Sequence, residues 1–294
     1  MGITERLANL SIPTVIITMV VLFLIRYVLR KQDAPFAKQA AELAESLAVA
    51  MGLVFLIIRP FIVQAFFIPS PSMVPTLLEH DHILVNKFIY RFKEPQRGDV
   101  IVFKSPPEAD REHGIERDFI KRVIAGPGEV VRITPGYVIV GDSTYERRDV
   151  AGALGASSAM VKLADGGILV DGRTVTPEEV AAAVGQPGAR VKIVPGRVYI
   201  NSKPLKEPYI AEDPEDPYPP ETPDNRYSVL PDRWTVKDGS GHLAVKIPEG
   251  KLLVVGDNRN ASHDARFWGL LDRDRVLGKA MFIFWPPGRV RLLH

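Results

Sequence analysis

The run Ser70-Pro71-Ser72, with Pro75 three residues later, is a place where side chains could do chemistry. The prolines keep this backbone extended or turned rather than helical, so the serine hydroxyls are presented by a loop. A serine held in this way can act as the nucleophile of acyl transfer if a neighbouring base takes its proton. The spacing alone is also typical of an ordinary solvated turn.

A serine nucleophile needs a base, and the composition limits the choice. The chain has no cysteine, which excludes a thiol nucleophile and a disulfide framework. Its six histidines stand in no recognisable triad context. A lysine can serve instead if burial lowers its pKa from about 10.4 to about 7 or 8, which changes the balance between its two protonation states by roughly 4 kcal/mol.

Lys121 lies in a short run, residues 118–124, that is typical of a β-strand with Phe119, Lys121 and Val123 on one face. The apolar neighbours favour the neutral amine, and Arg122, on the other face, adds a like charge nearby. We therefore predict a strongly lowered pKa for Lys121. The alternative is a charge that protects a sheet edge, which is the commoner use of a lysine in a strand.

Metal and nucleic acid have little support in the sequence. His80 and His82 flank Asp81, but two histidines at this spacing without further ligands are more typical of solvated side chains than of a metal site. We predict no metal and no cofactor. The 37 Lys and Arg residues balance 35 Asp and Glu without a long basic run, which argues against a nucleic-acid partner.

Two apolar segments precede the serines and would tie them to a membrane. Residues 7–25 contain 19 residues without a charge, close to the ~20 that a membrane-spanning helix needs. Residues 46–67 are interrupted by Arg59-Pro60 and Gln64, and we expect this segment to span and to end near Arg59. A cleavable signal peptide is the alternative for the first segment, and a buried core helix for the second.

The basic residues around these segments predict their orientation. Only Arg6 precedes the first segment, whereas the connection between the two holds Arg26, Arg30, Lys31 and Lys38. Short loops rich in Lys and Arg stay in the cytoplasm. The sequence therefore predicts an inside loop, with both termini and everything after Arg59 outside.

After Ser70 the apolar residues occur in short runs bounded by Gly, Pro and Asp, which predicts a β-rich domain with many turns. The clearest runs are residues 82–88, 99–103, 119–124, 197–200, 251–255 and 279–285. One helix is expected among them, because Thr176 can cap it, Pro177 suits its first position and Gly185 its end.

The sequence also contains a partial internal repeat. The string PGEVVRITPGYVIV at Pro127 matches PGARVKIVPGRVYI 60 residues later, either because a hairpin-sized unit was duplicated or by chance.

Several ordered boxes make the sequence recognisable. IPSPSMVPTL is followed by RGDVIVFKSP, FIKRVIAGPGE, GDNRNASHDARFWG and a final FIFWPPGR. In this order they resemble the conserved boxes of bacterial type I signal peptidases, over residues 59–128 and 256–278, whereas the part between is matched loosely. The resemblance implies a mostly β catalytic domain, a complex of antiparallel sheets, behind two N-terminal transmembrane helices.

The resemblance also implies a Ser/Lys dyad. Ser72 maps to the nucleophile and Lys121 to the general base. Ser70 maps to a hydroxyl that helps the Ser72 N–H to form the oxyanion hole, and Ser262 to the residue that orients the lysine amine. Arg122 is expected to pair with Asp257. The full supporting polar network maps to Arg122, Asp257, Arg259, Asp264 and Arg266.

Two departures from the family pattern bear on these roles. Pro71 stands where the family commonly has glycine, which removes an N–H and stiffens the loop. The resemblance therefore supports the geometry of the oxyanion hole less directly than it supports Ser72 as the nucleophile. Asn260-Ala261 replaces the usual acidic-then-amide pair, which weakens any role for those two positions.

The substrate and location are implied in the same way. The family binds its substrate as an added β-strand, with shallow pockets for small side chains at the first and third positions before the cut. The expected partners are signal peptides of exported preproteins, cut after Ala-X-Ala-type sequences, and membrane lipid. A monomer is expected in the bacterial inner membrane, multi-pass, with its catalytic domain on the outer, periplasmic side. The residues that map near the pockets, and that fit ordinary core packing equally well, are Ile68, Met73, Leu77 and Ile120.

The expected domain organisation follows from these segments. It consists of a first transmembrane segment with a short outer tail (1–30), a cytoplasmic loop (31–45), a second transmembrane or membrane-proximal segment (46–67), a β-rich catalytic domain (68–140 and 187–294) and an insertion (141–186).

Two other functions fit part of the pattern. A repressor-type self-cleaving protease shares the dyad, but it is cytoplasmic and carries a DNA-binding region, which the two apolar segments argue against. An inactive membrane-anchored β scaffold that binds exported chains would not need intact Ser72, Lys121 and Ser262.

Overall fold

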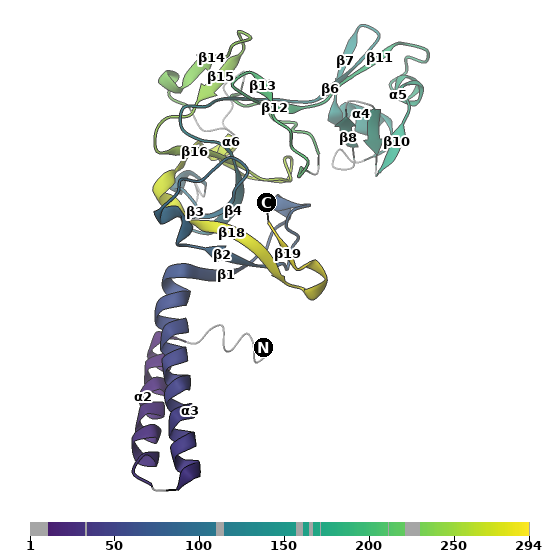
Figure 1. Ribbon diagram of the computed structural model, residues 1–294. Helices are drawn as coiled ribbons and strands as arrows, with labels where there is room; N and C mark the ends of the chain where they lie inside the picture. The colour runs from purple at the N-terminus through teal and green to yellow at the C-terminus, as the bar shows by residue number, and fades with distance from the viewer. Residues whose placement is uncertain are drawn as a thin grey trace.

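The computed structural model describes residues 11–32, 34–109, 115–156, 161–164, 167–170, 172–210, 212–220 and 230–293. Two N-terminal helices lead into a body of antiparallel β-sheets (Figure 1). The fold class is therefore the one that the sequence predicts, a mostly β domain behind N-terminal helices.

The two helices form an antiparallel pair that projects from the β body (Figure 1). The first is α2 (Ile12–Leu29); the second, α3 (Pro35–Gly52), continues as the π-helix η1 (Leu53–Ile62) into the first strand. An ion pair of 2.8 Å joins Arg26 of α2 to Glu45 of α3. Small side chains let helix backbones approach closely, and those buried on α3 are Ala37, Ala41, Ala44 and Ala48.

The second helix begins earlier than we expected. The sequence predicts a loop over residues 31–45, but α3 already begins at Pro35. Proline is favoured at the first helical position, and the alanine-rich run after it has high helix propensity. By length and composition Pro35–Leu56 can cross a membrane, whereas Pro13–Leu29 is apolar but shorter. Residues 7–10 of the first expected segment lie outside the described residues.

The main sheet has the strand order β1-β2-β18-β3-β4-β16-β17, with β19 paired to β18. All of its described pairs are antiparallel. All six runs predicted from the sequence contain strands. The strands of this sheet are β1 (Val63–Phe67), β2 (His82–Asn86), β3 (Val100–Lys104), β4 (Asp118–Ala125), β16 (Lys251–Val255), β17 (Leu271–Asp272), β18 (Val276–Trp285) and β19 (Arg291–Leu292).

A second sheet packs against the first and has the order β13-β12-β5-β15-β14. The main core contains Ile101 and Phe103 from the main sheet together with Val131 and Ile133 from the second. The strands of the second sheet are β5 (Val130–Thr134), β12 (Arg197–Ile200), β13 (Lys203–Pro204), β14 (Thr235–Lys237) and β15 (Leu243–Lys246). Short 3-10 turns connect the strands of the body at η2 (Pro71–Met73), η3 (Ile89–Arg91), η4 (Pro107–Ala109), η6 (Asp232–Trp234), η7 (Arg273–Arg275) and η8 (Pro287–Arg289), and one short helix, α6, spans Ala265–Trp268.

Residues 137–194, called the accessory unit, have a hydrophobic core of their own. The predicted helix is present as α5, with Thr176 as N-cap in a capping box with Glu179 and Pro177 at its first position. The unit is wider than the expected insertion at 141–186. Its elements are β6 (Tyr137–Val140), β7 (Ser143–Glu146), α4 (Arg147–Ala153), β8 (Val161–Ala164), β9 (Gly167–Val170), β10 (Arg173–Val175), α5 (Pro177–Ala183) and β11 (Val191–Val194).

The internal repeat has a structural reason. β5 pairs with β12 in the body, and β6 pairs with β11 in the accessory unit in the same continuous register. The two copies thus form one two-stranded ribbon (Figure 1). Its register places Pro135-Gly136 of one strand opposite Pro195-Gly196 of the other. A Cβ on Gly136 would lie 2.8 Å from the backbone nitrogen of Gly196. Both strands need glycine where they come this close, and the ribbon joins the accessory unit to the body.

Candidate active site

Ser72 and Lys121 are in direct contact although 49 residues separate them in the sequence. Ser72 lies in the turn η2 that follows β1, and Lys121 lies in the middle of β4. Lys121 Nζ donates a hydrogen bond to Ser72 Oγ at 2.9 Å and another to the Ile120 carbonyl at 3.0 Å. Ser72 is 7% exposed and Lys121 is 5% exposed. The site therefore holds a hydroxyl and an amine at proton-transfer distance and shielded from water.

Burial lowers the pKa of Lys121 from its ordinary value of 10.5 to about 8, because the ammonium loses its hydration. The carboxylate of Asp264 opposes this shift, Arg266 reinforces it, and Asp257 opposes it. The reinforcing cation is thus Arg266 rather than the Arg122 that we expected. Arg122 is neutralised by Asp257 in a buried ion pair.

The predicted pairing of Arg122 with Asp257 is confirmed. Arg122 Nε and Nη2 donate to the two carboxylate oxygens of Asp257 at 2.8 and 2.7 Å, and the Thr76 hydroxyl donates to the same carboxylate at 2.5 Å. Arg122 Nη1 also donates to the Gly98 carbonyl at 2.7 Å, and its guanidinium lies 4.0 Å from the ring centroid of Tyr209. These bonds fix the end of β16 against β4.

Residues 256–264, called the catalytic loop, connect β16 to α6, and buried charges fix both of their ends. Asp264 accepts hydrogen bonds from Arg266 Nε at 2.9 Å and from the Gly256 N–H at 3.0 Å. Burial alone would raise the pKa of Asp264, but Arg266 and the bonded N–H groups hold it below its ordinary value. Within the loop, Arg259 is paired with Glu207 at 2.5 Å and donates to the Gly256 carbonyl.

The catalytic loop also contacts the turn that carries Ser72. The Asn258 N–H donates to the Ser72 carbonyl at 3.1 Å, and Asn258 Nδ2 donates to the Pro71 carbonyl at 3.2 Å. A Cβ on Gly256 would lie 2.3 Å from Ser262 Oγ and 2.5 Å from the Ser72 carbonyl oxygen. Glycine is therefore required at this close approach, and the position of the loop determines the position of Ser72.

Ser70 and Ser262, the two serines expected to assist the dyad, differ in their contacts. Ser70 Oγ lies 3.3 Å from Ser72 Oγ. Ser262 is buried in the catalytic loop, and its hydroxyl lies beside the Asp264 carboxylate. The expected contribution of Ser70 to an oxyanion hole and of Ser262 to the orientation of the Lys121 amine stay predictions.

The four residues that map near the substrate pockets share one buried cluster. Ile68, Met73 and Leu77 are at most 2% exposed, and Ile120 is 9% exposed. They pack with neighbours that include Ile83 of β2. They thus form core next to the Ser72 turn, and their role in a substrate pocket stays a prediction.

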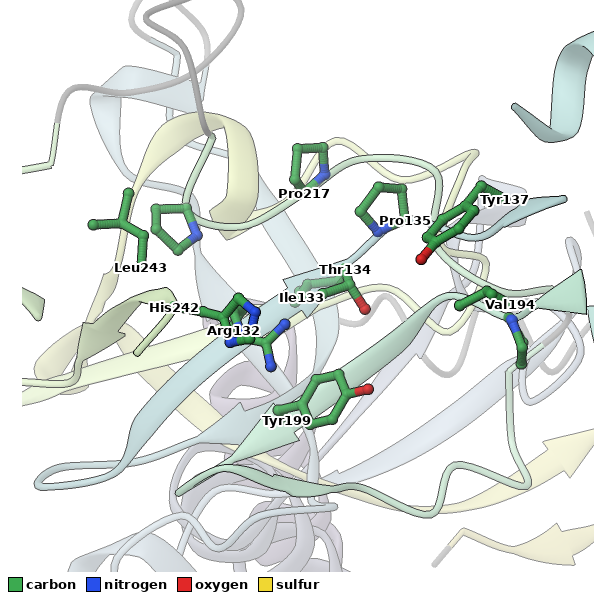
Figure 2. A pocket seen from close by; sticks show the side chains of 12 residues that line it. Arg132, Ile133, Thr134, Pro135, Tyr137, Val194, Tyr199, Pro217, His242 and Leu243 are labelled. Carbon is green, nitrogen blue, oxygen red and sulfur yellow. The ribbon is translucent and has the colours of Figure 1, made fainter. Parts of the chain in front are cut away.

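Two further features are a cavity and a pair of histidines. The cavity, of about 350 Å³, lies beside the ribbon and the loop at Pro217–Pro219, where Arg132 and Tyr199 line it, and none of the predicted site residues does so (Figure 2). The rings of His80 and His82 pack against Phe67, with centroids 5.6 and 5.4 Å apart. Across the part of the chain that the structure describes, no three His, Asp or Glu side chains gather as a metal site would require.

Sequence reasoning missed several residues that hold the site together. Gly256 and Asn258 stand inside a recognised box, so the Gly-Asp-Asn run was an available signal. Glu207 and Tyr209, which contact Arg259 and Arg122, come from a proline-rich acidic stretch with no local pattern that points to the dyad.

Comparison with known proteins gives a consistent result. The family model described as signal peptidase, peptidase S26, matches residues 40–180 and 182–285. A signal peptidase I of Leptolyngbya laminosa is 30% identical over 88% of this chain and 85% of its own. A signal peptidase I of Aquifex aeolicus is 34% identical over 79% of this chain and 80% of its own.

A solved structure also aligns with the chain. The crystal structure of a signal peptidase I from Enterococcus faecalis covers 64% of this chain and 97% of that chain, with 20% identity and a TM-score of 0.28. The family match and the two sequence relatives cover most of the chain, and the residues of the family match include Ser72 and Lys121. The chain therefore belongs to the signal peptidase family, peptidase S26, and is a signal peptidase, a serine endopeptidase.

Proposed function

We propose that this signal peptidase cuts its substrates with a Ser/Lys dyad in which Ser72 is the nucleophile and Lys121 the general base. The observation that carries the proposal is the 2.9 Å contact between Lys121 Nζ and Ser72 Oγ in a buried setting. With a pKa of about 8, Lys121 is neutral in about one molecule in ten at pH 7, whereas a lysine at 10.4 would be neutral in roughly one in 2,500. The lowered pKa therefore supplies the base that serine chemistry needs.

The reaction follows from this geometry. Neutral Lys121 takes the proton of Ser72 Oγ as the oxygen attacks the scissile carbonyl, which forms a C–O bond and a tetrahedral oxyanion. The Ser72 N–H and the Ser70 hydroxyl are the proposed donors to that oxyanion, since Pro71 has no N–H to offer. The Lys121 ammonium then gives its proton to the leaving amine as the C–N bond breaks. Water, deprotonated by Lys121, hydrolyses the acyl ester and returns Ser72 to its starting state.

The polar network is proposed to hold the dyad rather than to react. Arg122 with Asp257, and Arg266 with Asp264, fix the two ends of the catalytic loop. Ser262 is carried by the same loop and would orient the Lys121 amine once substrate excludes water. Because each of these ion pairs is almost fully buried, loss of one partner would leave an uncompensated charge and loosen the loop.

The substrate is proposed to bind as an added strand. β1 is the terminal strand of the main sheet and leads directly into the Ser70–Ser72 turn, so an extended peptide paired with its free edge would run towards Ser72. Shallow pockets for small side chains are proposed beside that turn, bordered by Ile68, Met73, Leu77 and Ile120, of which Ile120 keeps the largest exposed fraction, 9%.

We expect a purified preparation to cut a preprotein once, after an Ala-X-Ala-type sequence. Mass spectrometry of the two products locates the cut. Replacing alanine at either the first or the third position before the cut with leucine should reduce processing strongly, whereas leucine at the second should not. Equal processing of all three substrates would contradict the small pockets.

The chain is anchored to a membrane by an N-terminal helix, for which Pro35–Leu56 qualifies. We propose that α2 spans as well, that the connection near Gln32 faces the cytoplasm, and that the β body lies on the outer face of a bacterial inner membrane as a monomer. The Arg26–Glu45 pair supports this arrangement, because it holds the two helices in an antiparallel hairpin.

The absence of native cysteine allows a direct test of topology. Single cysteines placed at Gly2, at Gln32 and after His294 are reacted with a membrane-impermeant maleimide on intact spheroplasts. We expect labelling at the first and last positions and protection at Gln32→Cys until the membrane is opened. Protection of Gly2→Cys with labelling of the C-terminal cysteine would mean that only the second helix spans.

A further inference from the structure

Asn260 joins the catalytic loop to a distant segment of the chain. Its Oδ1 accepts a hydrogen bond from the Glu215 N–H at 2.9 Å, and its Nδ2 donates one to the Asp213 carbonyl at 3.0 Å. One amide side chain thus binds the backbone of residues 212–215, called the acidic segment, at two points. Asn260 lies two residues from Asn258, which bonds to the Ser72 carbonyl, and two residues from Ser262.

The opposite side of the acidic segment is bound to the accessory unit and the ribbon. The Asp213 carboxylate accepts hydrogen bonds from the Leu163 N–H of β8 at 3.0 Å and from the Gly196 N–H at 3.1 Å. Arg147 of α4 donates to Glu212 at 2.6 Å and to Glu215 at 2.8 Å, and also to the Val161 carbonyl. The acidic segment therefore lies between the accessory unit and the catalytic loop and is bonded to both.

The charged residues that bind the acidic segment to the accessory unit are buried. Arg147 is 1% exposed and Asp213 is 3% exposed. Charged groups so far from water need their partners, so the acidic segment cannot separate from the accessory unit without exposing or stranding a charge. The Asn260 side chain bonds the acidic segment through both its oxygen and its nitrogen, so a movement of the catalytic loop would break both hydrogen bonds. The fixed position of the acidic segment therefore restricts the catalytic loop.

We propose that Asn260 is a positioning residue that couples the accessory unit to the catalytic loop and thereby holds Ser72 and Ser262 in register with Lys121. The inference rests on the proposed dyad and adds a reason for the accessory unit to be attached where it is. Among the described residues, Asn260 makes no hydrogen bond to Ser72 or Lys121 and bonds instead to the backbone of Asp213 and Glu215. Its effect on cleavage passes through Asn258 and Ser262.

The test is a kinetic comparison of Asn260→Ala with the full-length wild type on one preprotein. We expect kcat to fall about tenfold while KM stays within about twofold, since a misplacement of the catalytic groups by about 1 Å, caused by a distant substitution, can cost up to ~10²-fold. A loosened loop admits water to Lys121, so the apparent pKa of the kcat–pH limb should rise above that of the wild type. Arg147→Met, at the far end of the connection, should change kcat and the limb in the same direction.

Gln186→Ala is the matched control, because Gln186 bonds Tyr145 inside the accessory unit and makes no described bond to the acidic segment. It should keep wild-type kinetics. If Asn260→Ala does not fold, Asn260→Gln keeps the amide on a longer side chain and should show a smaller change of the same sign. Folded Asn260 variants with wild-type kcat and pH limb overturn the coupling, even if their melting temperatures fall. An inactive wild type, or an active Lys121→Met variant, would instead count against the dyad.

Discussion

Replacing Lys121 with arginine or methionine is expected to lower kcat/KM for a preprotein by at least about 10³-fold, the order of loss seen when one member of a catalytic unit is removed. Arginine keeps the positive charge, but a guanidinium does not deprotonate in the working range of pH, so it cannot take the Ser72 proton. Methionine keeps much of the length without the amine. Steady-state cleavage assays measure the loss, and circular dichroism melts establish that the variants are folded.

The pH dependence of the wild type should carry the signature of the same lysine. Because the base must be neutral, kcat/KM should rise with pH along a limb whose apparent pKa is near 8, and it should level off above that pH. The limb should persist when His80, His82 and His263 are replaced together, since none of them is needed as the base. An active Lys121→Arg variant, or a limb that disappears with the three histidines, would show that another group takes the proton.

The lowered pKa also has a consequence for stability. Between about 8 and 10.5 the unfolded chain binds a proton on this lysine that the folded chain does not. The contribution of Lys121 to the free energy of unfolding should therefore increase as pH rises through that window. Measured against Lys121→Met, the stability of the wild type should improve across the same range.

Local signals in the sequence predicted much of the fold. The runs at residues 82–88 and 251–255 became β2 and β16 because short apolar stretches closed by Gly, Pro and Asp leave few alternatives. Thr176, Pro177 and Glu179 marked α5 because capping depends on neighbours within one turn. The predicted loop over residues 31–45 extended too far, because we interpreted the polar residues there as loop. Pro35 and the alanines after it favour a helix, and α3 begins at Pro35.

The site was predictable in part, and for a different reason. Spacing alone did not choose Ser72 or Lys121; the ordered boxes did, and the structure then brings the two side chains together. The source of the like charge near Lys121 could not be read from the strand pattern, because Arg266 reaches it from another element. Glu207 and Asn260 act through contacts between segments about 50 residues apart, which no local pattern reports.

Ser72→Ala is expected to remove processing as completely as the lysine variants do. The substitution deletes one oxygen atom and leaves the turn, the Asn258 bond to its carbonyl and the surrounding cluster in place. The fold should therefore be kept, with a melting temperature close to that of the wild type. Without the oxygen no acyl ester can form, and residual cleavage would come only from binding and the oxyanion donors.

The most direct measurement is a preprotein cleavage assay with purified wild-type and Ser72→Ala protein in the same detergent, followed by electrophoresis and mass spectrometry. The wild type should convert the preprotein into mature protein and released signal peptide. The Ser72→Ala protein, folded to the same extent, should leave the preprotein intact over the same period. Conversion by Ser72→Ala at the rate of the wild type would contradict the assignment of Ser72 as nucleophile and with it the dyad.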